Sequence, residues 1–162
     1  MTDSKVSGNL VLRFGCRGWR DLQWEGSYYP DDLPGDWQLG YYANDCDCVL
    51  VSGEELLAED PDQLTEAIED LPDGFRFLIS GADSSTLSEI ASKTGQHYGG
   101  SIEKLEDEIQ LFDVELPLNM RELRAELEKL PENCRFLVFR GNGVNPYVIG
   151  QVRQLAELMG IA

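Results

Sequence analysis

Basic residues are absent from one third of this chain. Positions 21–75 hold sixteen Asp and Glu residues and no Lys or Arg, so this segment carries −16 of the net charge of −17. Direct binding to nucleic acid requires a basic surface that contacts phosphates, and the composition therefore argues against it. An acidic surface can instead attract a basic protein partner; the alternative is a solvated face that mainly keeps the protein soluble.

Long apolar runs are also absent. No stretch approaches the roughly 18 apolar residues of a membrane span, and the N-terminal MTDSKVSGN contains no apolar signal-peptide segment. We therefore expect a cytoplasmic protein that does not interact with membranes. The length of 162 residues and the hydrophobic content of 42% are typical of a single domain, residues 1–162, with a core of its own.

Histidine and cysteine are scarce. His97 is the one histidine, and the cysteines are Cys16, Cys46, Cys48 and Cys134. Cys46 and Cys48 do not have the CxxC spacing typical of zinc sites, so we expect no metal site and no cofactor. Without a secretion signal, we expect the thiols to be reduced and buried. Cys16 could act as a nucleophile only beside a base, and His97 lies in a predicted flexible loop, GQHYGG.

Short apolar runs alternate with helical patterns along the chain. The runs at 10–14, 48–51, 75–79, 112–116 and 135–139 have the length and the branched or aromatic content of β-strands. Apolar residues recur at helical spacing within 36–43, 61–71, 85–93, 101–109, 120–130 and 146–160. This alternation predicts an α/β fold with a parallel sheet of about five strands.

The N-terminal segment resembles a known family. The stretch FGCRGW, followed by WEGSYYPDDLPGDWQLGYYA, is similar to the N-terminus of the YecE-like family of uncharacterised TIM-barrel proteins. The matching residues are Gly15, Gly18, Trp19, Trp24, Gly26, Tyr29, Pro30, Leu33, Tyr41, Tyr42 and Ala43. The segments FRFLISG, VELPLN and FLVFRG resemble later strands of that family. The resemblance implies a fold derived from a (β/α) barrel.

The chain departs from that family in length and in its strand ends. It looks like the first five strands of an eight-stranded barrel, which implies a partial (β/α) TIM barrel. Two arrangements of the sheet edges stay open: an intact monomeric sheet, or a homodimer that closes the edges. Leu50, Ser52, Val138 and Gly141 stand where the family has polar strand-end residues, and Arg140 alone remains of its fifth-strand motif. The resemblance therefore implies that most of any shared chemistry is lost here.

The strand ends also point to a candidate binding site. In parallel α/β folds, ligands bind beyond the carboxyl ends of the strands. This rule selects Arg17, Arg20, Arg140 and Asn142 as candidates for binding a small anion, because a guanidinium holds phosphate or carboxylate through two hydrogen bonds. The alternative is that these arginines pair with nearby acidic side chains.

The loop after the first predicted strand is rich in aromatic residues. Trp19, Trp24, Tyr28 and Tyr29 are candidates for a partner-binding surface, and the alternative is a lid that covers the open end of the sheet. We favour a non-catalytic binding protein that engages a basic protein partner through acidic residues 21–75 and this aromatic loop. The competing hypothesis is an enzyme or small-anion binder with its site at the C-terminal ends of the strands.

Overall fold

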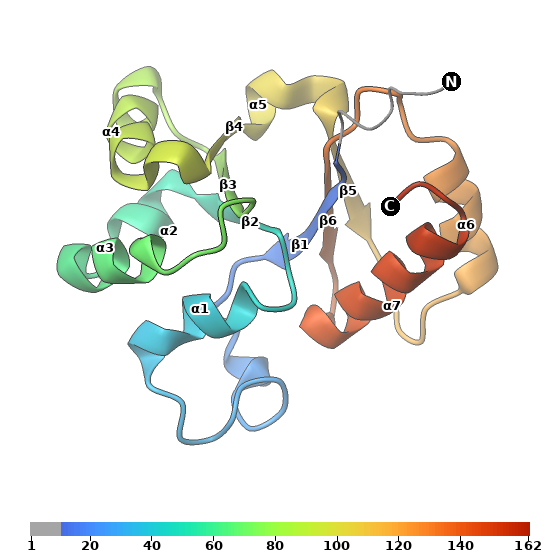
Figure 1. Ribbon diagram of the computed structural model, residues 1–162, viewed down its shortest axis with the longest axis horizontal. Coiled ribbons are helices and arrows are strands. Elements are labelled where there is room, and N and C mark those ends of the chain that lie inside the picture. Colours follow the sequence, from blue (N-terminus) through green and yellow to red (C-terminus); the bar gives the residue numbers. More distant parts are fainter. Residues whose placement is uncertain (1–10) are drawn as a thin grey trace.

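Parallel strands form one curled sheet at the centre of the molecule. The computed structural model describes residues 11–162, so Leu10 of the predicted strand 10–14 lies outside the described residues. Within this range the strands are β1 (Arg13–Arg17), β2 (Cys48–Ser52), β3 (Arg76–Ser80), β4 (Tyr98–Ser101), β5 (Ile109–Asp113) and β6 (Phe136–Arg140). Neighbouring strands are parallel, in the order β4-β3-β2-β1-β6-β5 (Figure 1). The predicted α/β fold with a partial, barrel-like parallel sheet is confirmed.

The strand order corrects one expectation about the barrel. The first five strands of a barrel would leave β1 at an edge, but β1 lies in the middle, between β2 and β6. In a closed (β/α) barrel the last strand pairs with the first, so β5 and β6 return to β1 as the final strands of a barrel do. The edges of this half-barrel are β4 and β5, which follow each other in the chain.

Helices cover the outer face of the sheet. In Figure 1, α2 (Gly53–Leu57), α3 (Pro61–Glu69) and α4 (Ser84–Thr94) lie on one side, and α6 (Met120–Glu128) and α7 (Pro146–Leu158) lie on the other. The short α1 (Gln38–Tyr42) ends the long loop after β1, and the single-turn α5 (Ile102–Leu105) connects β4 to β5. No helix within residues 11–162 is long and apolar enough to cross a membrane.

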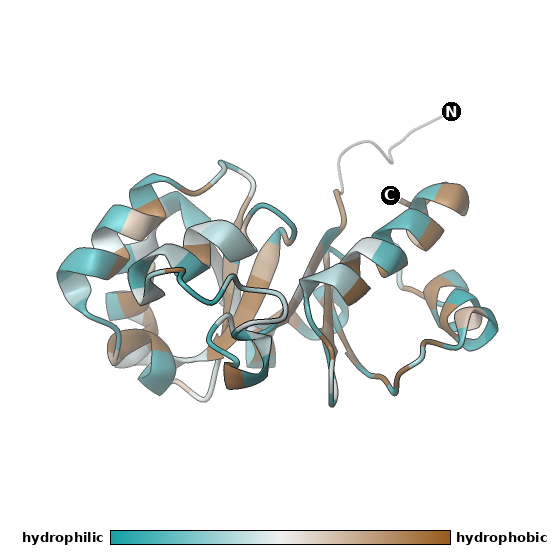
Figure 2. Ribbon diagram, turned by 90° about the horizontal axis from the view of Figure 1, so that it is seen from below, coloured by the Kyte–Doolittle hydropathy of each residue, from teal (hydrophilic) through white to brown (hydrophobic). Residues whose placement is uncertain are grey.

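Both faces of the sheet are buried, which explains the continuous apolar runs of its strands. On the outer face, Phe14, Val49 and Leu137 belong to the large core beneath the helices. The inner face carries a smaller buried cluster, against which α5 packs Ile102 and Leu105; its members are Cys48, Leu50, Leu78, Ile109, Phe136 and Val138. Figure 2 shows the same layering, with hydrophobic strands inside and hydrophilic outward surfaces on the helices.

Several expected element boundaries are wrong. Residues 98–101 form β4 rather than part of a loop, and the expected helix at 101–109 consists of the single turn of α5 followed by a 3-10 turn at Glu106–Glu108. Ile109 begins β5, three residues before the expected strand at 112–116. β1 ends at Arg17, three residues beyond the expected end at position 14. This last shift makes Arg17 the final residue of β1.

Candidate functional site

Polar side chains occupy the inner face at the carboxyl ends of five strands. Because side chains alternate along a strand, the last residue of a strand lies on the same face as the residue two positions earlier, and residues paired in register on neighbouring parallel strands share a face. In β2, β3 and β6 the residue two positions earlier is Leu50, Leu78 or Val138, a member of the inner cluster. The resulting set, which we call the polar mouth, consists of Arg17, Ser52, Ser80, Asp113 and Arg140.

Arg17 and Arg140 are neighbours in this mouth. The β1–β6 register pairs Gly15 with Val138 and Cys16 with Phe139, so the next step places Arg17 level with Arg140. Adjacent strands are about 4.8 Å apart, so the two side chains leave the backbone close enough together to reach one ligand. Two residues separated by 123 positions in the chain (140 − 17) are thus brought together by the central place of β1.

A helix cap holds the counter-ion of Arg17. The Ser52 hydroxyl accepts from the Glu55 backbone N–H at 3.0 Å, and Glu55 Oε1 accepts from the Ser52 backbone N–H at 3.0 Å, a capping box that starts α2. Arg17 Nη2 donates to the same Glu55 oxygen at 3.3 Å. The bond from the Ser52 N–H, opposed by partial burial and helped by the charge of Arg17, holds the pKa of Glu55 below its usual value.

Arg140 pairs with the neighbouring edge strand. Its Nε donates to Asp113 Oδ1 at 2.6 Å and its Nη2 to Asp113 Oδ2 at 3.4 Å. The next residue, Gly141, has φ of 151°, and a Cβ there would lie 2.2 Å from the Val114 carbonyl oxygen, so the chain needs glycine at this position. Asn142, the fourth predicted anion ligand, follows on an exposed turn.

Arg20 is engaged elsewhere. Its Nε and Nη2 each donate to a Glu59 carboxylate oxygen at 2.6 Å, and its Nη1 donates to the Gly35 carbonyl and to Gln38 Oε1. The hydrogen bonds with Glu59 raise the pKa of Arg20 further. Most of its donors are therefore used to join the loop after β1 to the end of α2, which makes Arg20 a structural link rather than a free anion ligand.

A cavity of about 390 Å³ adjoins the polar mouth at the ends of β1 and β2. Arg17, Trp19, Arg20, Glu55 and Glu59 are among its lining residues. The indole N–H of Trp19 is buried and has no hydrogen-bond partner within residues 11–162. This nitrogen is inaccessible from the cavity, so the unpaired donor is a cost of the local packing and offers a ligand no hydrogen bond.

Other polar residues after the strands are helix caps. The Asp83 carboxylate accepts from Thr86 N at 2.8 Å and starts α4, and the Asn119 side chain accepts from Glu122 N at 3.1 Å and starts α6. Asn145 Oδ1 accepts from Tyr147 N at 2.9 Å at the start of α7. Their sequence positions suit a ligand site equally well, but these oxygens satisfy backbone N–H groups.

The four aromatic residues predicted to bind a partner are interior. Trp19, Trp24, Tyr28 and Tyr29 are each at most 3% exposed and belong to the large outer core. Trp24 Nε1 donates to the Val144 carbonyl at 3.0 Å, and the Tyr28 hydroxyl donates to Asp45. Their rings extend the core beyond the end of β1, so these four side chains present no aromatic surface to a partner.

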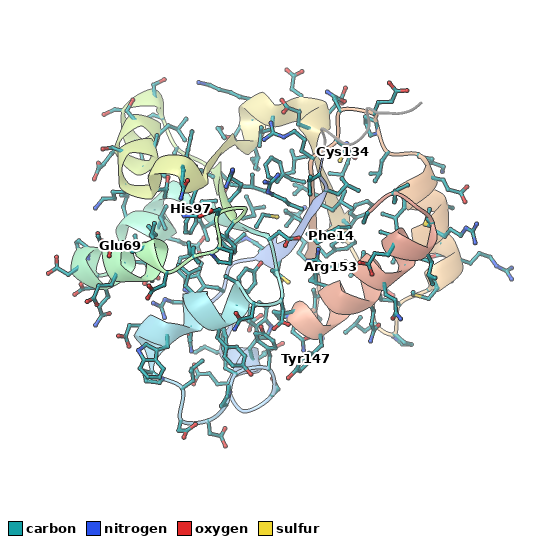
Figure 3. The ribbon with its side chains drawn as sticks, viewed as in Figure 1. Phe14, Glu69, His97, Cys134, Tyr147 and Arg153 are labelled. Atoms are coloured by element: carbon teal, nitrogen blue, oxygen red, sulfur yellow. The ribbon has the colours of Figure 1, made fainter. Side chains whose placement is uncertain are left out.

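The thiols and the histidine do not form a reactive pair. Burial raises the pKa of Cys16, which lies beside Cys46 and Cys48 in the core, and it raises the pKa of Cys134 to about 11. His97 Nδ1 lies 2.8 Å from the Phe75 carbonyl oxygen, and Figure 3 shows His97 and Cys134 apart from each other, on either side of β1. No cluster of three or more potential metal ligands occurs within residues 11–162.

Fold and site together define a parallel β/α half-barrel with a polar mouth at the carboxyl ends of its strands. Residues 13–141 match the family described as "Protein of unknown function DUF72", and the chain therefore belongs to this family. The crystal structure of a DUF72 family protein from Thermotoga maritima has a similar fold, with a TM-score of 0.60 and 10% sequence identity. The match covers 93% of this chain and 99% of that one. No curated protein matches the chain significantly.

Proposed function

We propose that this protein binds a small anion, a phosphate ester or a carboxylate, at the polar mouth. The observation that carries the proposal is the β1–β6 register, which ends both strands on an arginine facing the same side of the sheet. An anion between two guanidinium groups on adjacent strands accepts bidentate hydrogen bonds from both. Ligand sites of parallel α/β folds lie at this end of the sheet.

The counter-ions already present do not block such a ligand. The side chains of Arg17 and Glu55 are 48% and 51% exposed, and those of Arg140 and Asp113 are 41% and 74% exposed. Exposed ion pairs contribute only about 0–1 kcal/mol, so an anion held by both arginines can replace the carboxylates. The adjoining cavity, which Arg17 also lines, supports a ligand larger than a bare ion.

The family resemblance supports this proposal, whereas the aromatic loop gives no support to the competing hypothesis of a basic protein partner. The resemblance to YecE-like proteins supports the same location, because Arg140 is the residue kept from that family's fifth-strand motif. The hypothesis that the aromatic loop engages a basic partner loses support, because all four of its rings are interior. We therefore rank anion binding above partner binding as the function of this end of the sheet.

Thermal unfolding with added ligands tests the proposal. Inorganic phosphate, a sugar phosphate and a dicarboxylate are added at matched ionic strength to the native protein and to Arg17→Gln, Arg140→Gln and Arg124→Gln variants. A ligand that binds only the folded state raises its stability, by about 2.7 kcal/mol at a hundred times its Kd. We expect the Arg17 and Arg140 variants to weaken binding about tenfold to a hundredfold, the effect of one lost charged hydrogen-bond partner.

Arg124 provides the matched control. It is an exposed arginine on α6 that pairs with Glu128 at i,i+4, outside the mouth. Its replacement changes the net charge as the other two variants do, and it should leave ligand binding unchanged. Equal weakening in all three variants, or no stabilisation of the native protein by any of the three ligands, would contradict the proposal.

A further inference from the structure

An exposed tryptophan stands in a groove on the acidic side of the molecule. Trp37 is 64% exposed, whereas Trp19 and Trp24 are each 3% exposed. The groove has a volume of about 320 Å³ and lies between the loop before α1, α1 itself and the end of α3. Its lining residues are Leu33, Asp36, Trp37, Gly40, Tyr41, Asn44, Ala67 and Asp70. Tryptophan is rarely this exposed in proteins, and it is enriched at the centres of interfaces.

The charged residues that line this groove, Asp36 and Asp70, are both acidic. Exposed Asp32, Glu66 and Glu69 are chain neighbours of lining residues. Of the sixteen carboxylates in residues 21–75, those of Asp47, Glu55 and Glu59 form ion pairs with arginines within residues 11–162. None of these three lines the groove, so its carboxylates face solvent without a described ion pair.

We propose that this groove, the Trp37 groove, docks a segment of another protein that carries an arginine or lysine side chain. The cation stacks on the Trp37 ring, an arrangement that aromatic faces favour, while Asp36 and Asp70 neutralise its charge. The apolar surface of Leu33, Tyr41 and Ala67 contacts the rest of the segment. This is a second site, independent of the polar mouth.

Charge decides between this occupant and a second copy of the chain. Outside residues 21–75 the chain contains thirteen Lys and Arg against fourteen Asp and Glu, so the rest of a second copy carries no excess of positive charge to match the groove. Like charges that face each other across an interface cost free energy, which disfavours self-association here. A basic segment of a different protein is the complementary occupant.

Fluorescence anisotropy with a defined probe tests the Trp37 groove. The probe is a labelled peptide in which arginine alternates with alanine, and a peptide with glutamine in place of arginine is its reference. We expect the arginine peptide to bind the native protein at low salt, and to bind about tenfold more weakly to Trp37→Ala and to the Asp36→Asn/Asp70→Asn double variant. Binding should weaken as salt is raised to about 0.3 M, because exposed charges are then screened.

Two control variants distinguish the contribution of the groove residues to peptide affinity from that of the overall negative charge. Glu115→Gln/Glu132→Gln removes two exposed carboxylates outside the acidic segment, and Leu158→Ala removes a side chain that is 81% exposed. Both should retain the native affinity for the arginine peptide. Equal weakening in Glu115→Gln/Glu132→Gln and in the groove double variant, or native affinity in Trp37→Ala, would overturn the proposal.

Spermine tests whether the groove takes a protein segment or any small polycation. We expect spermine to displace the arginine peptide poorly, because it makes no use of the apolar walls. Displacement of the peptide by spermine at equal molar concentration would overturn the proposed class of occupant. Circular dichroism of each variant confirms folding, and the exposure of Trp37 makes its replacement compatible with the fold.

Discussion

The buried hydroxyl of Tyr42 bridges β1 and β2. The Tyr42 hydroxyl accepts from the Cys16 backbone N–H at 2.7 Å and donates to the Cys48 carbonyl at 2.7 Å. Beside it, a Cβ on Gly15 would lie 1.9 Å from the Cys48 carbonyl oxygen, so β1 and β2 meet here at a distance that only glycine permits. The hydroxyl therefore satisfies two backbone groups that lie between adjacent strands.

Tyr42→Phe should destabilise the protein. The variant keeps the ring but leaves the Cys16 N–H and the Cys48 carbonyl without this partner in a fully buried place, which costs about 1–3 kcal/mol. Urea unfolding followed by circular dichroism measures the change. Tyr147→Phe is the control: this residue is 57% exposed, its hydroxyl makes no hydrogen bond within residues 11–162, and it lies in the first turn of α7, where Figure 3 labels it. Equal effects of the two substitutions would refute the bridging role.

Among the helices, the capping box of α2 links secondary structure to the polar mouth. Ser52 ends β2, starts α2 and fixes Glu55, which in turn pairs with Arg17. The helix start and the charge balance of the mouth therefore depend on one carboxylate. A ligand that displaces Glu55 from Arg17 still leaves Glu55 bonded to the Ser52 N–H, so the helix cap survives ligand binding.

The lowered pKa of Glu55 predicts a pH dependence of stability. Because its folded-state pKa lies below the unfolded value of about 4.3, the cap contributes stability above that value and loses it as pH falls toward the folded pKa. Glu55→Gln should therefore lower the melting temperature at pH 7 and have a smaller effect at acidic pH. Thermal unfolding between about pH 7 and pH 3 checks this, with Glu54→Gln, the exposed neighbour in α2, as control. A melting-temperature difference that does not vary with pH would contradict it.

The strands that could be predicted are those with strong local signals. β2, β3 and β6 are buried on both faces, so their apolar runs match the structure to within one residue at each end. β4 reads YGGS and lies at an edge, so neither residue preference nor burial marks it as a strand. β1 continues through Gly15 and Arg17 because of its packing against β2 and β6, which a local pattern does not contain.

The candidate site was predictable only in part, because it also depends on contacts between distant parts of the chain. The rule of strand ends selects Arg17 and Arg140, but their adjacency depends on the pairing of the first strand with the last, a contact between distant parts of the chain. Arg20 and Trp19 are one position apart in sequence, and yet one is bound to Glu59 and the other is interior. Trp37 has no sequence signal that distinguishes it from the buried tryptophans. It ends the 3-10 turn Gly35–Trp37 before α1, and no residue of that turn is buried.

At the scale of the whole molecule, the net charge of −17 is concentrated on the side that carries α2 and α3. Fourteen of the sixteen carboxylates in residues 21–75 are exposed, so they lie on the surface rather than in buried ion pairs. Surface charges of one sign repel each other and oppose the compact state. A surface that is unfavourable for folding but complementary to a basic partner is consistent with the Trp37 groove as a docking site.

Neutralising acids on α3 should therefore stabilise the protein. Glu66 lies four residues after Asp62, and Glu69 occupies the last position of the helix, where the macrodipole disfavours negative charge; Figure 3 shows Glu69 projecting outward from α3. We expect Glu66→Gln/Glu69→Gln to raise the free energy of unfolding by about 0.5–1 kcal/mol at low salt. The gain should shrink at about 0.3 M salt, where screening already weakens the repulsion. Urea unfolding at both salt concentrations measures this gain in the free energy of unfolding. Glu115→Gln/Glu132→Gln is the charge-matched control. An equal gain in that control would mean that net charge alone, rather than the crowding of acids on α3, sets the stability.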